Sequence, residues 1–195
     1  MNRMKWLAIT IISLTLILTL GSCAKPPTAE ADAARAAVEA AESNPDVPVY
    51  AANTLARAKD SLSRMESEIT AKNYDSAKAL ALETEKTANE AVSEAKTAKE
   101  RAKSSASSLL DSLKINIAET EKALASAKKT RGIKLDFAAA SAEIAAVKKS
   151  ADSAGNDFNS GAFKASIEKG ESAQSKLSAL NKLISDAVRS ASKKK

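Results

Sequence analysis

Apolar and polar residues alternate with helical spacing along almost the whole chain. A stretch at about 29–43 is rich in Ala, with Val38 as its one larger apolar residue. At about 49–71 the apolar residues recur three or four positions apart, and they are Leu55, Ala58, Leu62, Met65 and Ile69. This spacing places all five on one face of an α-helix. Because no run alternates with period two, we predict an all-α protein.

A longer seam of small residues follows the turn at 72–75, where Asn73 is a candidate for a left-handed closing position. No Gly or Pro occurs from there until Gly132. The seam keeps the alternating spacing of three and four that coiled coils require. Its members are Ala77, Ala81, Thr84, Ala88, Ala91, Ala95, Ala98, Ala102, Ser105, Leu109, Leu113, Asn116, Thr120, Leu124 and Ala127. The pattern predicts one helix of about 54 residues, roughly 80 Å long.

Two more helices are predicted after Gly132. Asp136 can cap a helix that runs to about residue 154, and the turn-rich stretch 155–161 separates it from a last helix at about 162–191. The fold class predicted is an elongated, coiled-coil-like bundle of antiparallel helical hairpins with one long central helix. We expect a first hairpin region at 29–131, which includes the long helix, and a second at 132–195.

An internal repeat connects the two halves at an offset of about 89 residues. It pairs Leu55 with Ile144 and Tyr74 with Phe163, and it repeats the order helix, turn, helix, aromatic turn, helix. A degenerate duplication is predicted. The larger aromatic residues fall near predicted turns, where they either plug hairpin ends or border a small ligand groove; they are Tyr50, Tyr74, Phe137, Phe158 and Phe163.

The amino terminus has the pattern of a secretory signal. Basic residues in 1–5 precede an uncharged, mostly apolar run at 6–20, which is shorter than the roughly 20 residues that span a bilayer. Leu20-Gly21-Ser22-Cys23 follows, and this arrangement resembles the lipobox of bacterial lipoproteins. The resemblance implies cleavage after residue 22, a diacylglycerol thioether on Cys23, and a lipidated spacer at 23–28. The alternative is an ordinary signal peptide followed by an unmodified cysteine.

Composition removes several kinds of active site. The chain has no His and one Cys, so a Ser-His-Asp triad, a Cys-His pair, an imidazole zinc site and an internal disulfide are excluded. Glycine-rich phosphate loops are also missing. Glu83 and Glu85 lie two positions apart on a helix and point to different sides, so we expect no joint metal site. We predict no enzyme, no cofactor, no metal and, with a mild formal charge of +6, no nucleic-acid partner.

Charge is unevenly distributed along the mature sequence. Residues 24–100 contain 10 basic and 14 acidic side chains, whereas residues 101–195 contain 18 basic and 10 acidic ones. The basic half could contact an anionic polymer or lipid headgroups, or the opposite fields could help the two hairpins dock. The terminal Lys195 either keeps a helix end soluble or resembles the peptidoglycan-linked terminal lysine of Braun's lipoprotein.

The region from Ala33 to Lys103 resembles a known bacterial family. Its features are the Ala-x-x-Ala steps of the first helix, Val47-Pro48-Val49-Tyr50 before the second, and Asn73-Tyr74-Asp75-Ser76-Ala77 at the turn. They are similar to the domain of unknown function 4398, an alanine-rich domain of bacterial envelope lipoproteins. The resemblance implies a helical hairpin and brings no catalytic residue with it.

Together these features predict a lipoprotein anchored to the outer membrane through Cys23 and facing the periplasm. Its expected work is structural or scaffolding, with membrane lipid, envelope proteins or a second copy of the chain as partners. The alternative is a lipoprotein that binds or tethers peptidoglycan with its basic half or Lys195. A third possibility, a carrier of a small ligand, would require a cavity lined by larger side chains.

Overall fold

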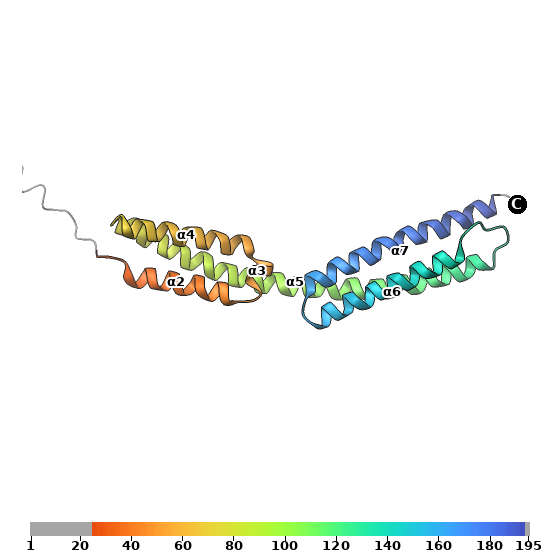
Figure 1. Ribbon diagram of the computed structural model, residues 1–195, viewed down its shortest axis with the longest axis horizontal. Coiled ribbons are helices and arrows are strands. Elements are labelled where there is room, and N and C mark those ends of the chain that lie inside the picture. The colour runs from red at the N-terminus through yellow and green to blue at the C-terminus, as the bar shows by residue number, and fades with distance from the viewer. Residues whose placement is uncertain (1–24, 194–195) are drawn as a thin grey trace, which may run out of the picture. The chain divides into compact units, whose positions relative to one another are not determined.

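The computed structural model describes residues 25–193, and these residues form helices and no strand (Figure 1). The helices are α2 (Thr28–Ser43), α3 (Val47–Tyr50), α4 (Ala52–Thr70), α5 (Tyr74–Lys128), α6 (Phe137–Asn159) and α7 (Phe163–Ser192). The predicted all-α class and the long central helix are confirmed, since α5 contains 55 residues. By its contacts the chain divides into two compact units, Met1–Ser93 and Glu94–Lys195, called unit 1 and unit 2.

Unit 1 combines α2, α4 and the first part of α5 around a core of mostly small side chains. The fully buried members of this core include Ala31, Ala34, Met65 and Ala81. Alanine side chains allow helix axes to approach closely but bury little apolar area for each residue. Unit 1 therefore depends on helix propensity and on polar contacts between helices more than a leucine-rich bundle would.

Unit 2 combines the second part of α5 with α6 and α7, and its core contains larger side chains. Leu113, Val147 and Leu177 are completely buried, one from each helix. Gly170 in α7 lies against α5, because a Cβ built there would come 2.6 Å from Leu109 Cδ2. This close approach explains why a glycine stands inside a helix, where it normally costs about 1 kcal/mol relative to alanine.

The turns before α5 and before α7 have the same backbone hydrogen bonds. In each turn three amides donate to carbonyls at matching positions: Ala71, Lys72 and Asn73 to Ser67, Ile69 and Glu68, and Ser160, Gly161 and Ala162 to Asn156, Phe158 and Asp157. The left-handed residue is Lys72 (φ 61°) in the first turn and Gly161 (φ 82°) in the second. The two turns are thus related by the offset of the predicted repeat. The left-handed position predicted for Asn73 was one residue too late.

Two predicted helix boundaries and one predicted seam position differ from the structure. The predicted helix at 49–71 is divided, because buried Ala51 has φ −136° and separates α3 from α4. Helix α6 continues through Gly155 to Asn159, since Gly161 alone supplies the left-handed residue that the turn needs. In the seam of α5, Ser105 is exposed and Ala106 is fully buried, so a step of four residues replaces the predicted step of three.

Candidate functional site

The two residues to which the sequence assigns covalent chemistry, Cys23 and Lys195, lie outside the described residues. The described chain begins just after Cys23, and α2 starts at Thr28 with Pro27 before it. Only a short spacer therefore separates Cys23 from the first helix. Within residues 25–193, no helix has the length and apolarity that crossing a bilayer requires.

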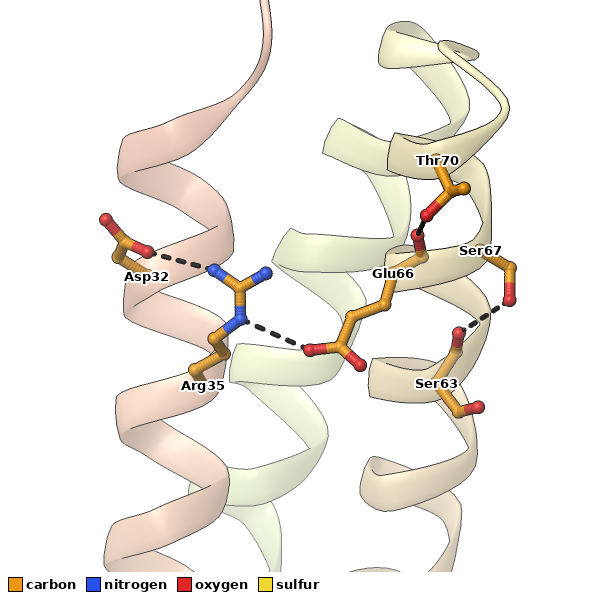
Figure 2. A network of polar contacts seen from close by, with 6 residues as sticks. All are labelled: Asp32, Arg35, Ser63, Glu66, Ser67 and Thr70. Carbon is orange, nitrogen blue, oxygen red and sulfur yellow. Dashed lines mark hydrogen bonds and ion pairs between the residues drawn. The ribbon is translucent and has the colours of Figure 1, made fainter.

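Acidic side chains of unit 1 pair with residues of the same helix, of a neighbouring helix and of the turn before α5. Figure 2 shows Arg35 of α2 between two carboxylates, with Nη1 3.0 Å from Asp32 Oδ1 and Nε 3.2 Å from Glu66 Oε1 of α4. Glu68 accepts a hydrogen bond of 2.8 Å from Asn73 Nδ2. Among the described residues, no three potential metal ligands of the His, Cys, Asp or Glu type lie together.

Two more ion pairs join α2 to the rest of unit 1. Lys59 Nζ of α4 lies 2.6 Å from Glu42 Oε1, and Lys78 Nζ of α5 lies 2.7 Å from Glu30 Oε1. The hydrogen bond from Lys78 lowers the pKa of Glu30, and the same bond raises the pKa of Lys78. Both shifts favour the charged forms. Ion pairs thus hold α2 to both of its neighbours.

A buried pair of hydroxyls connects α4 to α5 in unit 1. Thr84 Oγ1 donates to Ser61 Oγ over 2.9 Å, and the two residues are 0% and 4% exposed. A buried hydroxyl without a partner would cost about 1–3 kcal/mol, so each residue satisfies the other. The pair fixes the relative register of two helices whose surrounding seam is mostly alanine.

Unit 2 has comparable contacts between its own helices. Lys148 Nζ of α6 lies 2.6 Å from Glu121 Oε1 of α5, and Asn116 Nδ2 of α5 donates to Gln174 Oε1 of α7 over 3.1 Å. These pairs join residues 27 and 58 positions apart. No local spacing in the sequence could have paired them, although the polar character of Asn116, a member of the predicted seam, was visible.

The aromatic residues of unit 2 pack at helix ends. Phe158 and Phe163 flank the turn between α6 and α7, with ring centroids 5.4 Å apart and planes tilted by 58°. Phe137, at the start of α6, packs against the core of unit 2, and Lys128 Nζ lies 6.0 Å from its ring centroid. These contacts support the interpretation that aromatic side chains plug hairpin ends.

Positive charge collects where α5 ends and α7 ends. Exposed cations occur in the last residues of both helices and in the loop before α6; we call this set the basic end, and it comprises Lys128, Lys129, Arg131, Lys134, Arg189 and Lys193. Residues of these segments line two grooves, one on each side of α7. One is lined by Thr130 and Arg189, and the other by Lys134 and Ser190.

Comparison with known proteins finds a family match over part of the chain. Residues 29–107, less than half of the chain, match the family described as "Domain of unknown function (DUF4398)". No curated protein and no solved structure matches the chain. The matched region covers α2, α3, α4 and the first part of α5, which is the region that the sequence motifs indicated. Residues 29–107 are therefore similar to the family of the domain of unknown function 4398.

Proposed function

We propose that this chain is a lipoprotein of the bacterial cell envelope, anchored through Cys23, whose helices serve as a structural or protein-interaction scaffold. The observation that carries the proposal is the lipobox-like Leu20-Gly21-Ser22-Cys23, which directly precedes the spacer and a family domain of helices. Diacylglycerol on the thiol provides two acyl chains and acylation of the new amino group provides a third, enough for stable membrane anchoring. Thus the chemistry proposed for Cys23 supports a permanent anchor.

The described helices support a scaffold in two ways. Their ordered polar contacts, such as Arg35 with Glu66 and Lys148 with Glu121, join helices to one another. In addition, long stretches of α5 and α7 expose charged and hydroxyl side chains to solvent. Such faces suit contacts with other envelope proteins or with a second copy of the chain.

The proposed location is the outer membrane, facing the periplasm. Ala24 and Lys25 follow Cys23, and the lack of Asp in these positions favours the outer membrane by the sorting rule of enteric bacteria. An anchor at residue 23 and a spacer that ends at Thr28 would hold α2 near the membrane surface.

Cell fractionation with matched cysteine variants tests the anchor. Wild type, Cys23→Ser and the double variant Cys23→Ser/Ser104→Cys are expressed in bacteria and divided into soluble and membrane fractions. Ser104 is exposed in α5, so the double variant restores the cysteine count at a position without a lipobox. We expect cleaved, detergent-extractable wild type in the membrane fraction and no such form for either variant. A cleaved wild-type chain in the soluble fraction would contradict the proposal.

A second candidate function is binding of the cell wall by the basic half of the chain. The observation that favours it is the basic end of unit 2, whose cations lie on two helices and a loop that meet along shared grooves.

A further inference from the structure

A groove between α5 and α7 borders the basic end of unit 2. Its volume is about 540 Å³. Its floor contains apolar residues such as Ala127 and Ile184, and its polar lining consists of four hydroxyls, one amide and one guanidinium, which come from Ser126, Thr130, Ser185, Ser192, Asn181 and Arg189. Hydroxyls and amides both donate and accept hydrogen bonds, and Arg189 adds a permanent positive charge. Thr130 and Ser192 already donate to the carbonyls of Ser126 and Val188, so their hydroxyl oxygens act as acceptors. The lining contains no carboxylate.

Among the described residues, no carboxylate forms an ion pair with the cations around this groove. Within residues 25–193, none of the six residues of the basic end forms an ion pair, whereas Arg35, Lys59 and Lys78 of unit 1 all do. Lys128 faces the ring of Phe137 instead. Among the described residues, the carboxylates closest in sequence to these cations are Asp136, which accepts a hydrogen bond from the amide of Ala139, and Asp186, which lines the other groove. Positive charge at this end therefore exceeds negative charge.

Helix dipoles offset only a small part of this excess of positive charge. The carboxyl ends of α5 and α7 each carry about half a negative charge, and the amino end of α6 carries about half a positive charge. The net dipole contribution is thus about half a negative charge, against six cations and two carboxylates. Most of the positive charge remains available to an external anion.

We propose that this groove and the basic end bind a polar polymer that carries carboxylates together with hydroxyls and amides, as the peptide-linked glycan of the cell wall does. Arg189 would form an ion pair with a carboxylate of the polymer. The hydroxyls and Asn181 would form hydrogen bonds with its polar groups, and the apolar floor would contact its carbon skeleton. A bilayer fits less well, because Ile133 and Leu135 of the loop are half-buried and pack against the core instead of projecting outward. The choice of polymer rests on the envelope location proposed above.

The test is cosedimentation of the full-length chain, in non-ionic detergent, with peptidoglycan sacculi freed of bound protein. The variant Lys129→Glu/Arg131→Glu/Arg189→Glu reverses charge at the basic end. The control Lys103→Glu/Lys114→Glu/Lys149→Glu makes the same change in net charge at exposed positions elsewhere in unit 2. We expect about ten-fold or greater weakening for the first variant and less than about two-fold for the control. Binding should also weaken as salt is added.

Arg189→Gln provides a milder variant, since it removes the charge without placing an anion at the carboxyl end of α7. It should weaken binding measurably, while circular dichroism should show an unchanged helix content. Equal loss in the two triple variants, or no binding by wild type, would overturn the proposal. Release of the bound chain by micelles containing phosphatidylglycerol but not by poly-glutamate would assign the site to lipid and overturn the choice of polymer. None of these readouts requires Cys23 to be lipidated, so they fail or succeed separately from the anchor.

Discussion

At the residue scale, Lys72 has a backbone conformation that is unfavourable for a residue with a side chain. It has φ 61° in the turn before α5, and it is the one residue other than glycine with positive φ in the described part of the chain. A left-handed conformation costs an L-residue roughly 1–2 kcal/mol, and glycine avoids this cost. The matching turn before α7 has Gly161. The difference between the turns is therefore a difference in local strain.

Replacing Lys72 with glycine should stabilise unit 1. We expect a gain of about 1 kcal/mol, reduced by the larger entropy of glycine in the unfolded chain. Chemical denaturation of the full chain, followed by circular dichroism, measures the shift. Gly161→Lys is the reciprocal variant and should destabilise, whereas Lys72→Ala, which keeps a Cβ, should change little. Destabilisation by Lys72→Gly would contradict this account of the turn.

The buried hydroxyl pair permits a second prediction at this scale. Ser61→Ala and Thr84→Val should each destabilise by about 1–2 kcal/mol, because each leaves the other hydroxyl buried without its partner. The double variant should lose less than the sum, with a coupling of about 1 kcal/mol. A double-mutant cycle by denaturation measures this coupling. Strict additivity would show that the 2.9 Å contact contributes nothing.

At the scale of the elements, spacing of small and apolar residues was enough to predict most helices. The predicted helix at about 162–191 corresponds to Phe163–Ser192, and the long helix corresponds to Tyr74–Lys128. The ends of the helices were predicted less well, because the sequence of a turn does not indicate which of its residues adopts the left-handed conformation. Gly155 attracted the prediction of a turn, yet it lies inside α6, where burial of Ala154 and packing of Phe158 maintain the helix. These contacts favour continuation of α6 past Gly155, and the left-handed Gly161 follows its end.

The interhelical pairs could not be predicted from the sequence. Arg35 and Glu66 are 31 positions apart, and each has nearer partners of opposite charge along the chain. Which of these possible partners forms the ion pair depends on the packing of the helices. The excess of cations in 101–195 was visible in the sequence. Only the structure shows that Arg189 and the hydroxyls of α7 line the same groove.

Association of α2 with α5 should depend on pH through Glu30 and Lys78. Because the pKa of Glu30 is lowered, the stabilisation is present above the pKa of an unfolded glutamate and is lost as pH falls through the lowered value. Because the pKa of Lys78 is raised, the stabilisation is present below the pKa of an unfolded lysine and is lost as pH rises through the raised value. The pair therefore contributes most at neutral pH.

Glu30→Gln removes this pH dependence and tests it. The difference in unfolding midpoint between wild type and Glu30→Gln should be largest at neutral pH and should shrink in acid and in strong alkali. Glu39→Gln, at an exposed carboxylate of α2, is the control and should show no comparable profile. High salt should reduce the difference, since the pair is partly exposed. A difference that does not vary with pH would contradict the role of the pair.

At the scale of the whole molecule, the chain consists of two helical units with related turns and different cores. Unit 1 has an alanine-rich core and most of the family match, whereas unit 2 has larger buried side chains and the basic end. The duplication predicted from the sequence would account for the shared turn, and divergence of its copies would account for these differences. The proposed division of work follows: the amino-terminal region carries the anchor, and unit 2 carries the surface for an anionic polymer.

The central claim is the lipid anchor at Cys23, and mass spectrometry of the mature amino terminus tests it most directly. The full-length chain, purified from bacterial membranes and digested, should give an amino-terminal peptide that begins at Cys23 and carries the added mass of diacylglycerol and an acyl group. A terminus at Cys23 with an unmodified thiol, or a chain still beginning at Met1, would contradict the account.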